Sequence, residues 1–285
     1  MERFRDKVAV ITGAANGIGL GLARRCAREG MKLVLADIEE TALSLAEKEM
    51  KTAGTPVLAV PTDVSKGGDL EALARQTLEE FGAVHLLFNN AGVATGGPVW
   101  EKSLADWEWV INVDLWGVIH GVRTFVPIML DQGDECYIVN TSSIAGLNSG
   151  VGSGTYRVAK HGVVTLSESL YHDLKVRKAK IGVSVFCPGP ISTLIFESAR
   201  NRPPELGNRA PEHPPSPEES SIREWFQNRV RNGMPPEKAA DHVFDAIRQN
   251  RFYILTHPEY KEAIRMRMED ILQDRAPTLP PMELQ

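Results

Sequence analysis

The sequence predicts an α/β fold: a single domain built on a doubly wound parallel sheet of about seven strands, with helices on both faces. Short runs rich in β-branched residues alternate with helical patterns, and this order is typical of βαβ units. The 285 residues, of which 42% are hydrophobic, suffice for one large domain with a substantial core. No repeat with a fixed period occurs, which argues against solenoids and propellers.

Each element of this fold has its own segment of the sequence. The strand pattern occupies residues 7–13, 32–37, 55–64, 85–90, 136–143, 180–189 and 252–256. Helical patterns follow the first three strands, and later ones cover residues 103–130, 155–176, 235–250 and 259–273. We therefore expect one domain over residues 1–275, followed by a proline-rich tail at 276–285.

One segment, residues 194–235, interrupts this alternation between the sixth strand and the next helix. The prolines and polar residues around 203–217 are incompatible with regular structure, and Ser221 and Glu224 offer a capping box for a short helix. Long insertions of this kind are often lids or binding loops. We expect residues 194–235 to form a substrate-binding lid.

Composition argues against several classes of protein. The net charge of −5 leaves no basic footprint for nucleic acid, and the histidines do not show zinc-ligand spacing. The N-terminus lacks the pattern of a signal peptide, and no segment is expected to be apolar over a membrane-spanning length. An odd number of widely spaced cysteines, Cys26, Cys136 and Cys187, points to a reducing compartment. We expect a cytoplasmic protein with no metal, no nucleic-acid partner and no membrane partner.

The first strand runs directly into a glycine-rich turn that opens the first helix. The turn contains, in order, Gly13, Asn16, Gly17, Ile18 and Gly19. Glycines let the backbone turn tightly and approach a pyrophosphate at a helix N-terminus. The spacing G-x-x-x-G-x-G differs from the more common G-x-G-x-x-G, and such a turn can also merely connect a strand to a helix. Our interpretation is a dinucleotide site.

The second strand ends at Asp37, whose carboxylate can accept hydrogen bonds from the ribose hydroxyls of adenosine. The neighbouring Ile38, Glu39 and Glu40 supply no cation for a 2′-phosphate, and the two glutamates would repel one. Asp37 can alternatively act as a helix N-cap. Its place after the second strand favours the ribose, so the sequence favours NAD over NADP.

Tyr156 and Lys160 lie four residues apart on a predicted helix, so both side chains project from one face. An unperturbed tyrosine has a pKa near ~10, and the positive charge of Lys160 favours the phenolate. Tyr156 would then accept a proton from an alcohol or donate one to a ketone. Ser143, at the end of the fifth strand, offers a hydroxyl for the substrate oxygen, with Ser142 as the alternative in register. The Tyr-Lys pair alone is a weak signal, because Y-x-x-x-K is frequent on amphipathic helices.

Taken in order, these motifs resemble the short-chain dehydrogenase/reductase (SDR) family, which has a Rossmann-type fold. The resemblance covers residues 4–195 and includes TGAANGIG, then Asp63 and Val64 after the third strand, then NNAG after the fourth. It implies an adenine contact at Asp63 and Val64 and a cofactor wall formed by Asn90, Ala91 and Gly92. An Asn-Asn-Ala-Gly turn can also simply end a strand.

The resemblance also implies catalytic roles. Spacing within the family favours Ser143 over Ser142, and Asn112 matches the asparagine that positions a water beside the lysine. The implied tetrad is Asn112, Ser143, Tyr156 and Lys160.

After the sixth strand, the family motif PG-x-x-x-T implies contacts to the nicotinamide, in particular from the Ile191 backbone and the Thr193 hydroxyl. The residues involved are Pro188, Gly189, Ile191 and Thr193. A simple Pro-Gly turn is the alternative.

Three positions depart from the family pattern without removing a catalytic group. Arg157 and Ala159 stand where a small residue and a serine are common, and Asp114 stands where asparagine is common.

Two other functions are compatible with the dinucleotide motifs alone: a catalytically silent NAD-binding sensor or scaffold, and an NAD-using epimerase or dehydratase. The complete tetrad argues against the first, and the modest length of the insertion argues against the second.

The substrate is expected to be a bulky apolar or aromatic secondary alcohol or ketone. Apolar residues of the insertion would face apolar residues of the domain across a cavity, namely Leu194, Ile195, Phe196, Trp225 and Phe226 against Val93, Ile144, Leu147 and Val151. These residues can alternatively anchor the insertion or contact another subunit. The insertion also resembles a subgroup that includes bacterial aryl-alcohol dehydrogenases acting on lignin-derived ethers.

Apolar helix faces at 103–130 and 155–176, which pair between subunits in the family, imply a homodimer or homotetramer.

Overall fold

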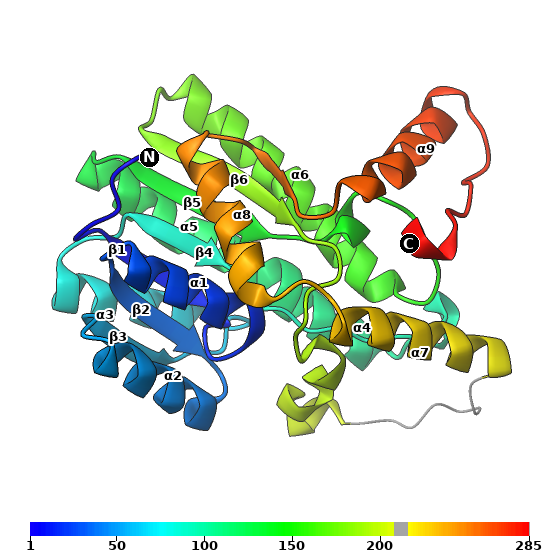
Figure 1. Cartoon of the computed structure of the whole chain (residues 1–285), viewed down its shortest axis with the longest axis horizontal. Coiled ribbons are helices and arrows are strands. Elements are labelled where there is room, and N and C mark those ends of the chain that lie inside the picture. Colours follow the sequence, from blue (N-terminus) through cyan, green and yellow to red (C-terminus); the bar gives the residue numbers. More distant parts are fainter. Residues whose placement is uncertain (208–215, 285) are drawn as a thin grey trace.

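The computed structural model describes residues 1–207 and 216–284, which contain one seven-stranded sheet covered by helices (Figure 1). The strand order is β3-β2-β1-β4-β5-β6-β7, and every neighbouring pair is parallel. The strands are β1 (Val8–Thr12), β2 (Lys32–Asp37), β3 (Val57–Pro61), β4 (Leu86–Asn89), β5 (Cys136–Thr141), β6 (Ile181–Cys187) and β7 (Tyr253–Leu255). Each lies inside a segment predicted as a strand, so the doubly wound fold is confirmed.

The helices lie on both faces of the sheet because its strands are apolar on both faces. They are α1 (Gly17–Arg28), α2 (Glu40–Thr52), α3 (Gly67–Phe81), α4 (Leu104–Ile111), α5 (Gly117–Gln132), α6 (Gly154–Val176), α7 (Pro217–Arg231), α8 (Pro236–Arg248) and α9 (Lys261–Leu272). Ala9 and Ile11 of β1 belong to the core beneath α1, α2 and α8. Val8 and Val10 belong to the core beneath α3, α5 and α6. This continuous burial is typical of parallel sheets.

Short turns of 3₁₀-helix complete the fold: η1 (Val99–Glu101), η3 (Ile144–Gly146), η4 (Ile195–Asn201), η5 (Pro204–Leu206), η6 (Pro258–Tyr260) and η7 (Met282–Leu284). The carboxyl ends of the strands point towards the side on which α7, α9 and the C-terminal tail lie (Figure 1). The three cysteines are buried in the core and unpaired.

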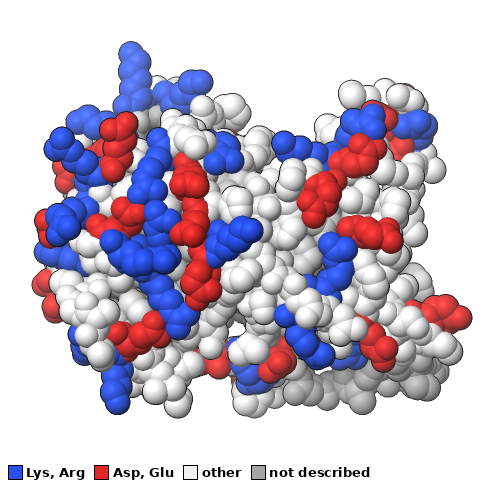
Figure 2. Space-filling view, viewed as in Figure 1, with Lys and Arg blue, Asp and Glu red and all other residues white. Residues whose placement is uncertain are grey.

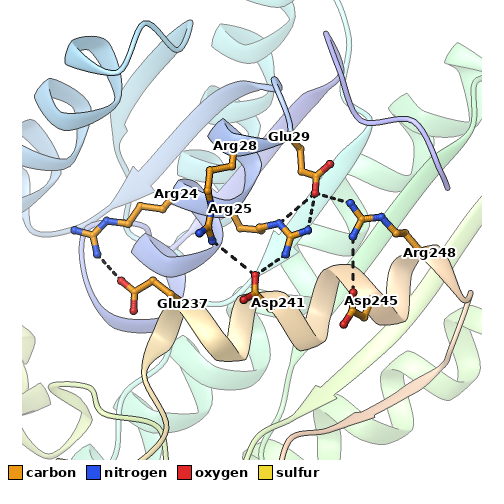
Figure 3. A network of polar contacts seen from close by, with 8 residues as sticks. All are labelled: Arg24, Arg25, Arg28, Glu29, Glu237, Asp241, Asp245 and Arg248. Atoms are coloured by element: carbon orange, nitrogen blue, oxygen red, sulfur yellow. Dashed lines mark hydrogen bonds and ion pairs between the residues drawn. The ribbon is translucent and has the colours of Figure 1, made fainter.

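Helices α1 and α8 are distant in sequence and pack directly against each other. A Cβ on Gly21 would lie 2.7 Å from the Pro236 carbonyl oxygen, so the two backbones approach closely. A network of ion pairs joins the outer faces of the two helices (Figure 3); it consists of Arg24, Arg25, Arg28, Glu29, Glu237, Asp241, Asp245 and Arg248. Figure 2 shows that acidic and basic side chains interleave on this face of the molecule, so no basic patch forms there.

The helical stretch predicted over residues 103–130 is present but not uniform. It begins with a capping box, in which the Ser103 hydroxyl accepts a hydrogen bond from the Asp106 amide. A π-helical segment, η2 (Asn112–Trp116), separates α4 from α5. A π-helical turn takes up more residues than an α-helical turn, so it changes which side chains after it face the sheet.

The expectation that no segment is apolar over a membrane-spanning length is wrong for this stretch. Among the described residues, Leu104–Gln132 forms one helix long and apolar enough to cross a membrane, and 33% of its most apolar window is buried inside the fold. Val118, Phe125 and Met129 belong to the buried core. A single helix of this kind is weak evidence for a membrane, because core helices of globular domains meet the same criterion.

The insertion comprises η4, η5 and α7, while residues 208–215 lie outside the described part of the chain. The predicted capping box at Ser221 and Glu224 is wrong, because the helix starts earlier. Ser216 accepts a hydrogen bond from the Glu219 amide at 3.1 Å, and Pro217 occupies the first helical position. The Ser221 hydroxyl instead donates to the Pro217 carbonyl within the helix.

The tail after α9 is attached to the domain at two points. The amide of Thr278 donates to Asp270 at 2.7 Å. The side chain of Asn148, in the loop after η3, donates to the Leu284 carbonyl at 3.0 Å. The tail up to Leu284 therefore lies against the loop that connects β5 to α6.

Candidate active site

A cavity of about 360 Å³ opens at the carboxyl ends of the strands, where the strand order reverses between β1 and β4. Open α/β sheets bind ligands at such switch points. All the site residues predicted from sequence line this cavity except Gly19 and Asn112. The predicted residues that line it are Gly13, Asn16, Gly17, Ile18, Asp37, Ile38, Asp63, Val64, Asn90, Ala91, Gly92, Ser143, Tyr156, Lys160, Pro188, Gly189, Ile191 and Thr193.

The glycine turn forms one end of the cavity and needs glycine for steric reasons. Gly13 has a φ of +63° and a Cβ on it would lie 2.8 Å from the Ala91 Cα. A Cβ on Gly17 would lie 2.9 Å from the Thr193 side chain. Gly19 does not line the cavity, and a Cβ there would lie 1.9 Å from the Gly13 carbonyl oxygen, so this glycine lets α1 pack on the turn. The cradle at the start of α1 fits a pyrophosphate.

Asp37 ends β2 at the cavity wall and is 9% exposed. Its two carboxylate oxygens accept one hydrogen bond each, from the Ala15 amide at 2.9 Å and from the Glu39 amide at 3.0 Å. Burial raises the pKa of Asp37, and these hydrogen bonds oppose the increase. Each oxygen keeps acceptor capacity for a ribose hydroxyl. The N-cap of α2 is Glu39, so the alternative role of Asp37 as that N-cap is not observed.

A cation that sequence reasoning missed lies beside this carboxylate. Arg200 of η4 pairs with Glu39 at 2.6 Å, and the Asn201 amide group donates to Glu39 at 2.9 Å. The hydrogen bond from Arg200 is the main reason why the pKa of Glu39 is lowered. Arg200 and Asn201 both line the cavity. The sequence neighbours of Asp37 supply no cation, but the insertion brings Arg200 to this end of the cavity, where it is paired with Glu39.

Asn90 joins the segment after β4 to the glycine turn. The Thr12 hydroxyl oxygen accepts hydrogen bonds from the amides of Asn90 at 2.9 Å and Ala91 at 3.1 Å. The Asn90 side chain donates in return to the Thr12 carbonyl at 3.0 Å. The Thr141 hydroxyl at the end of β5 donates to Asn90 at 3.4 Å. Asn90 thus fixes the shape of the cavity wall.

Ser143, Tyr156 and Lys160 converge at the other end of the cavity. Ser143 and Tyr156 both line the cavity, and hydrogen bonding by Ser143 lowers the pKa of Tyr156. The Lys160 Nζ lies 5.4 Å from the centroid of the Tyr156 ring and donates to the Thr141 carbonyl at 3.2 Å. The hydroxyl of Ser142, the alternative in register, donates to the Lys160 carbonyl at 2.8 Å and supports α6. The geometry favours Ser143 as the serine that contacts a bound substrate.

The structure does not bring Asn112 to this group. Asn112 begins the π-helical segment and does not line the cavity. Asp114 lies there instead: its Oδ1 accepts from the Val93 amide at 2.7 Å, and its Oδ2 lies 3.1 Å from the Lys160 Nζ. A Cβ on Gly92 would lie 3.3 Å from that Nζ, so glycine leaves room for the pair. Asp114 is thus the residue of this segment that pairs with Lys160. The role of Asn112 in positioning a water beside the lysine stays a prediction.

The buried charges determine the protonation equilibria of the site. Burial raises the pKa of Asp114. Burial alone would lower the pKa of Lys160, but the neighbouring Asp114 carboxylate raises it above its ordinary value. Burial raises the pKa of Tyr156, while Lys160 and the Ser143 hydrogen bond lower it and Asp114 raises it. Lys160 therefore acts in the predicted direction, but it does not bring the pKa of Tyr156 below its ordinary value.

Residues 188–193 form the wall between the catalytic group and the insertion. The Ile144 amide donates to the Pro188 carbonyl at 3.0 Å, and the Gly189 amide donates to the Thr256 hydroxyl at 3.1 Å. The Met234 amide, between α7 and α8, donates to the Pro190 carbonyl at 3.0 Å. These contacts hold the backbone of Ile191 and the side chain of Thr193 at the cavity, where the resemblance expects a nicotinamide.

Comparison with known proteins identifies the family. The sequence pattern of short chain dehydrogenases matches residues 7–204. The chain belongs to the short-chain dehydrogenase family. A CLA biosynthesis dehydrogenase/reductase of Lactiplantibacillus plantarum is 36% identical over 277 residues, which are 97% of each chain. A C alpha-dehydrogenase of Sphingobium sp. strain SYK-6 is 35% identical over 281 residues, 97% of this chain and 89% of the relative. These similarities identify an SDR oxidoreductase and confirm the predicted resemblance.

Solved SDR structures show the same fold. A short chain dehydrogenase/reductase from Burkholderia phymatum, crystallised in complex with NAD, matches with a TM-score of 0.94 and 47% identity over 99% of both chains. The apo form of LigD from Sphingobium sp. strain SYK-6 matches with a TM-score of 0.78 and 30% identity, over 96% of this chain and 100% of that one.

The cavity of this SDR continues beyond the shared motifs, towards the insertion. Of the residues predicted to form an apolar substrate compartment, Val93, Ile144, Leu194, Ile195, Phe196 and Phe226 line it. Leu147 and Val151 do not, and Trp225 lines a separate second cavity. Sequence reasoning missed Trp109, Ile222, Arg229, Val230 and Tyr260. The members on α7 share one helical face, so their spacing was a usable signal.

Arg157 departs from the SDR pattern and is 8% exposed. Its Nη1 donates to the Asn148 side chain at 2.7 Å, and no carboxylate pairs with it in the described part of the chain. Burial lowers the pKa of Arg157 to about 10. Its positive charge lowers the pKa of the adjacent Tyr156. Arg157 therefore adds a second positive charge beside Tyr156. The first, that of Lys160, is compensated by the carboxylate of Asp114.

Proposed function

We propose that this SDR is an NAD-dependent oxidoreductase that transfers hydride between the nicotinamide and a secondary alcohol or ketone. The observation that carries the proposal is the convergence of Ser143, Tyr156 and Lys160 on one cavity, with the glycine turn at its other end. A nucleotide cradle and an acid/base group that share one cavity favour hydride transfer over simple binding. The same convergence argues against a catalytically silent sensor.

A bound nicotinamide accepts a hydride when an alcohol is oxidised and donates one when a ketone is reduced. Tyr156 takes the proton of the substrate hydroxyl in the first direction and returns it to the carbonyl oxygen in the second. The Ser143 hydroxyl holds the substrate oxygen next to the phenol. Lys160 stabilises the phenolate form, and Asp114 holds Lys160 in place.

NAD is the proposed cofactor in preference to NADP. The carboxylate of Asp37 has acceptor capacity for both ribose hydroxyls and would repel a 2′-phosphate. The one nearby cation found among the described residues, Arg200, is already paired with Glu39. The matching Burkholderia structure contains NAD, which agrees with this assignment.

The proposed substrates are bulky apolar or aromatic secondary alcohols and the corresponding ketones. Phe226, Ile222 and Leu194 supply an apolar wall opposite the catalytic group. Residues 194–235 would act as the substrate lid, because η4 and α7 both line the cavity. A C alpha-dehydrogenase and a CLA biosynthesis dehydrogenase/reductase are among the relatives, and both names agree with hydride transfer.

Two properties of the proposed enzyme concern its surroundings. We assign it to the cytoplasm, since three buried free thiols suit a reducing compartment. We also assign it a homodimeric or homotetrameric state. Trp116 on η2 is 43% exposed and Val158 on α6 is 52% exposed, and these two apolar side chains mark the helix faces expected to pair between subunits.

The test compares the wild type with Tyr156→Phe in NADH-absorbance assays over a panel of secondary alcohols and ketones. We expect kcat/KM to fall by about 10²–10⁴-fold while NADH still binds, because the ring remains and the proton-transfer group is lost. Tyr253→Phe is the matched control, since this hydroxyl contacts Glu168 on the surface. Equal turnover by Tyr156→Phe and the wild type would refute the acid/base role. NAD binding without turnover of any alcohol or ketone would favour the sensor.

A further inference from the structure

Arg229 on α7 is a charged residue in the apolar part of the cavity. It lines the cavity together with Ile222, Phe226 and Val230 from the same helix face. Its Nη2 donates to the Tyr260 hydroxyl at 3.0 Å, and its guanidinium carbon lies 6.0 Å from the centroid of that ring. These contacts hold the guanidinium in one place at the cavity wall.

A second aromatic ring reinforces this position. The guanidinium of Arg229 lies 4.8 Å from the centroid of the Trp225 ring, and Arg229 and Trp225 both line a second cavity, so Arg229 borders both cavities. An arginine that stacks on aromatic rings keeps its planar set of donors available for a ligand. Since the side chain is already ordered, binding a ligand costs little further conformational entropy.

No acidic side chain among the described residues forms an ion pair with Arg229. Two other arginines of the insertion are paired: Arg200 with Glu39 and Arg202 with Asp106. Residue Glu259, next to Tyr260, is exposed and forms no ion pair in the part of the chain that the structure describes. The Nε and Nη1 groups of Arg229 therefore have donors to offer.

Arg229 also lies close to the catalytic end of the cavity. A Cβ on Gly189 would lie 2.9 Å from the Tyr260 ring, so that ring packs directly on the turn that leads to Ile191. The Tyr260 hydroxyl in turn contacts Arg229. Arg229 is thus separated from the predicted nicotinamide segment by a single aromatic ring, and it lines the same cavity as Tyr156.

We propose that Arg229 binds a carboxylate of the substrate, which is then a secondary alcohol or ketone with an apolar body and an anionic end. This inference rests on the proposed hydride-transfer function and specifies its substrate class. A guanidinium presents two parallel donors that match a carboxylate, and the surrounding apolar side chains strengthen the charge interaction. A phosphate dianion would require further cations, and the nearby Arg157 is instead held by Asn148.

The experiment compares two matched pairs of substrates with NAD as the oxidant: a secondary aryl alcohol with a para-carboxylate against its methyl ester, and a mid-chain hydroxy-octadecanoate against its methyl ester. We expect the wild type to show about tenfold or higher kcat/KM for the acid of at least one pair. In Arg229→Gln the kcat/KM for that acid falls by about 10- to 100-fold, mainly through KM, since a charge-assisted hydrogen bond is lost. The ester changes by less than about threefold.

Controls separate this inference from a general loss of function. Arg229→Lys retains the charge and recovers part of the acid preference. Arg223→Gln removes an exposed positive charge from the same helix, away from the cavity, and behaves as the wild type. Equal loss for acid and ester in Arg229→Gln, or no preference for either acid in the wild type, refutes the carboxylate site while hydride transfer stands. No NAD reduction with any of the four compounds or with the wider panel contradicts the proposed function itself.

Discussion

The carboxylate of Asp114 lies 3.1 Å from the ammonium group of Lys160, and both side chains are buried within reach of Tyr156. Asp114 raises the pKa of Tyr156, whereas Lys160, Arg157 and the Ser143 hydrogen bond lower it. Removal of the negative charge takes away one of the contributions that raise this pKa, while burial, the larger one, remains. In Asp114→Asn we therefore expect the rise of kcat/KM for alcohol oxidation to shift to lower pH.

The measurement is a pH profile of alcohol oxidation for the wild type and Asp114→Asn. Asn112→Ala is the matched control, because Asn112 lies two residues away and does not line the cavity. Its profile should coincide with that of the wild type. A profile that moves in Asn112→Ala and stays in place in Asp114→Asn would favour the predicted role of Asn112, which is to position a water beside the lysine.

The pair of Arg200 and Glu39 predicts how cofactor preference can be changed. Glu39→Gln removes the negative charge that pairs with the guanidinium of Arg200 near the adenosine ribose site. The guanidinium is then available to the 2′-phosphate of NADP, and a carboxylate that would repel this phosphate is absent. We expect the ratio of kcat/KM for NADP to that for NAD to rise by about tenfold, the effect of roughly one charge-assisted hydrogen bond. Glu40→Gln removes the same charge from an exposed position without a contact to Arg200 and should leave the ratio unchanged. A wild type that prefers NADP would overturn the assignment of NAD.

The close approach of α1 and α8 predicts a stability effect that is independent of catalysis. In Gly21→Ala the new methyl group would lie 2.7 Å from the Pro236 carbonyl oxygen, so the helices must separate. We expect the free energy of unfolding to fall by about 1–3 kcal/mol in denaturant titrations. Gly68→Ala is the comparison, because a Cβ there meets nothing within 4 Å and should be neutral or slightly stabilising. Equal stability of both variants would show that this helix contact is not tight.

The exposed apolar residues Trp116 and Val158 predict where copies of the chain meet. The double substitution Trp116→Glu, Val158→Asp places charge on this surface and should lower the molar mass found by size exclusion with light scattering. Val176→Asp is the control, since Val176 is 86% exposed at the end of α6. An unchanged mass in the double variant, or a monomeric wild type, would contradict this placement of the interface.

Local sequence signals predicted the strands and the order of the motifs because those features depend on neighbours in the chain. The alternation of Val8, Ala9, Val10 and Ile11 between the two cores needs only β geometry and two covering layers. The glycine turn, Asp37 and the Tyr-Lys pair could be found in the same way. The sequence also contains a signal for the start of α7, since Ser216, Pro217 and Glu219 match a capping box, although we predicted the cap at Ser221.

The remaining features depend on geometry that no local pattern carries. Asp114 rather than Asn112 meets Lys160 because a π-helical segment interrupts the helix, and hydrophobic periodicity does not reveal such a segment. Arg200 meets Glu39 across 161 residues of sequence. Arg229 of α7 contacts Tyr260 of η6, a segment that follows β7 in the sequence. The contacts of Arg200 and Arg229 form only when the insertion packs on the rest of the domain.

The insertion contributes residues to both ends of the cavity: Arg200 and Asn201 beside the adenosine side, and Phe226 and Arg229 beside the substrate side. In the proposed enzyme, one polypeptide segment would therefore cover the nucleotide and the alcohol together. We expect this arrangement to impose a sequence of events on each turnover, in which the dinucleotide enters first and leaves last. The rate at which the segment lifts, rather than the hydride step, would then limit kcat.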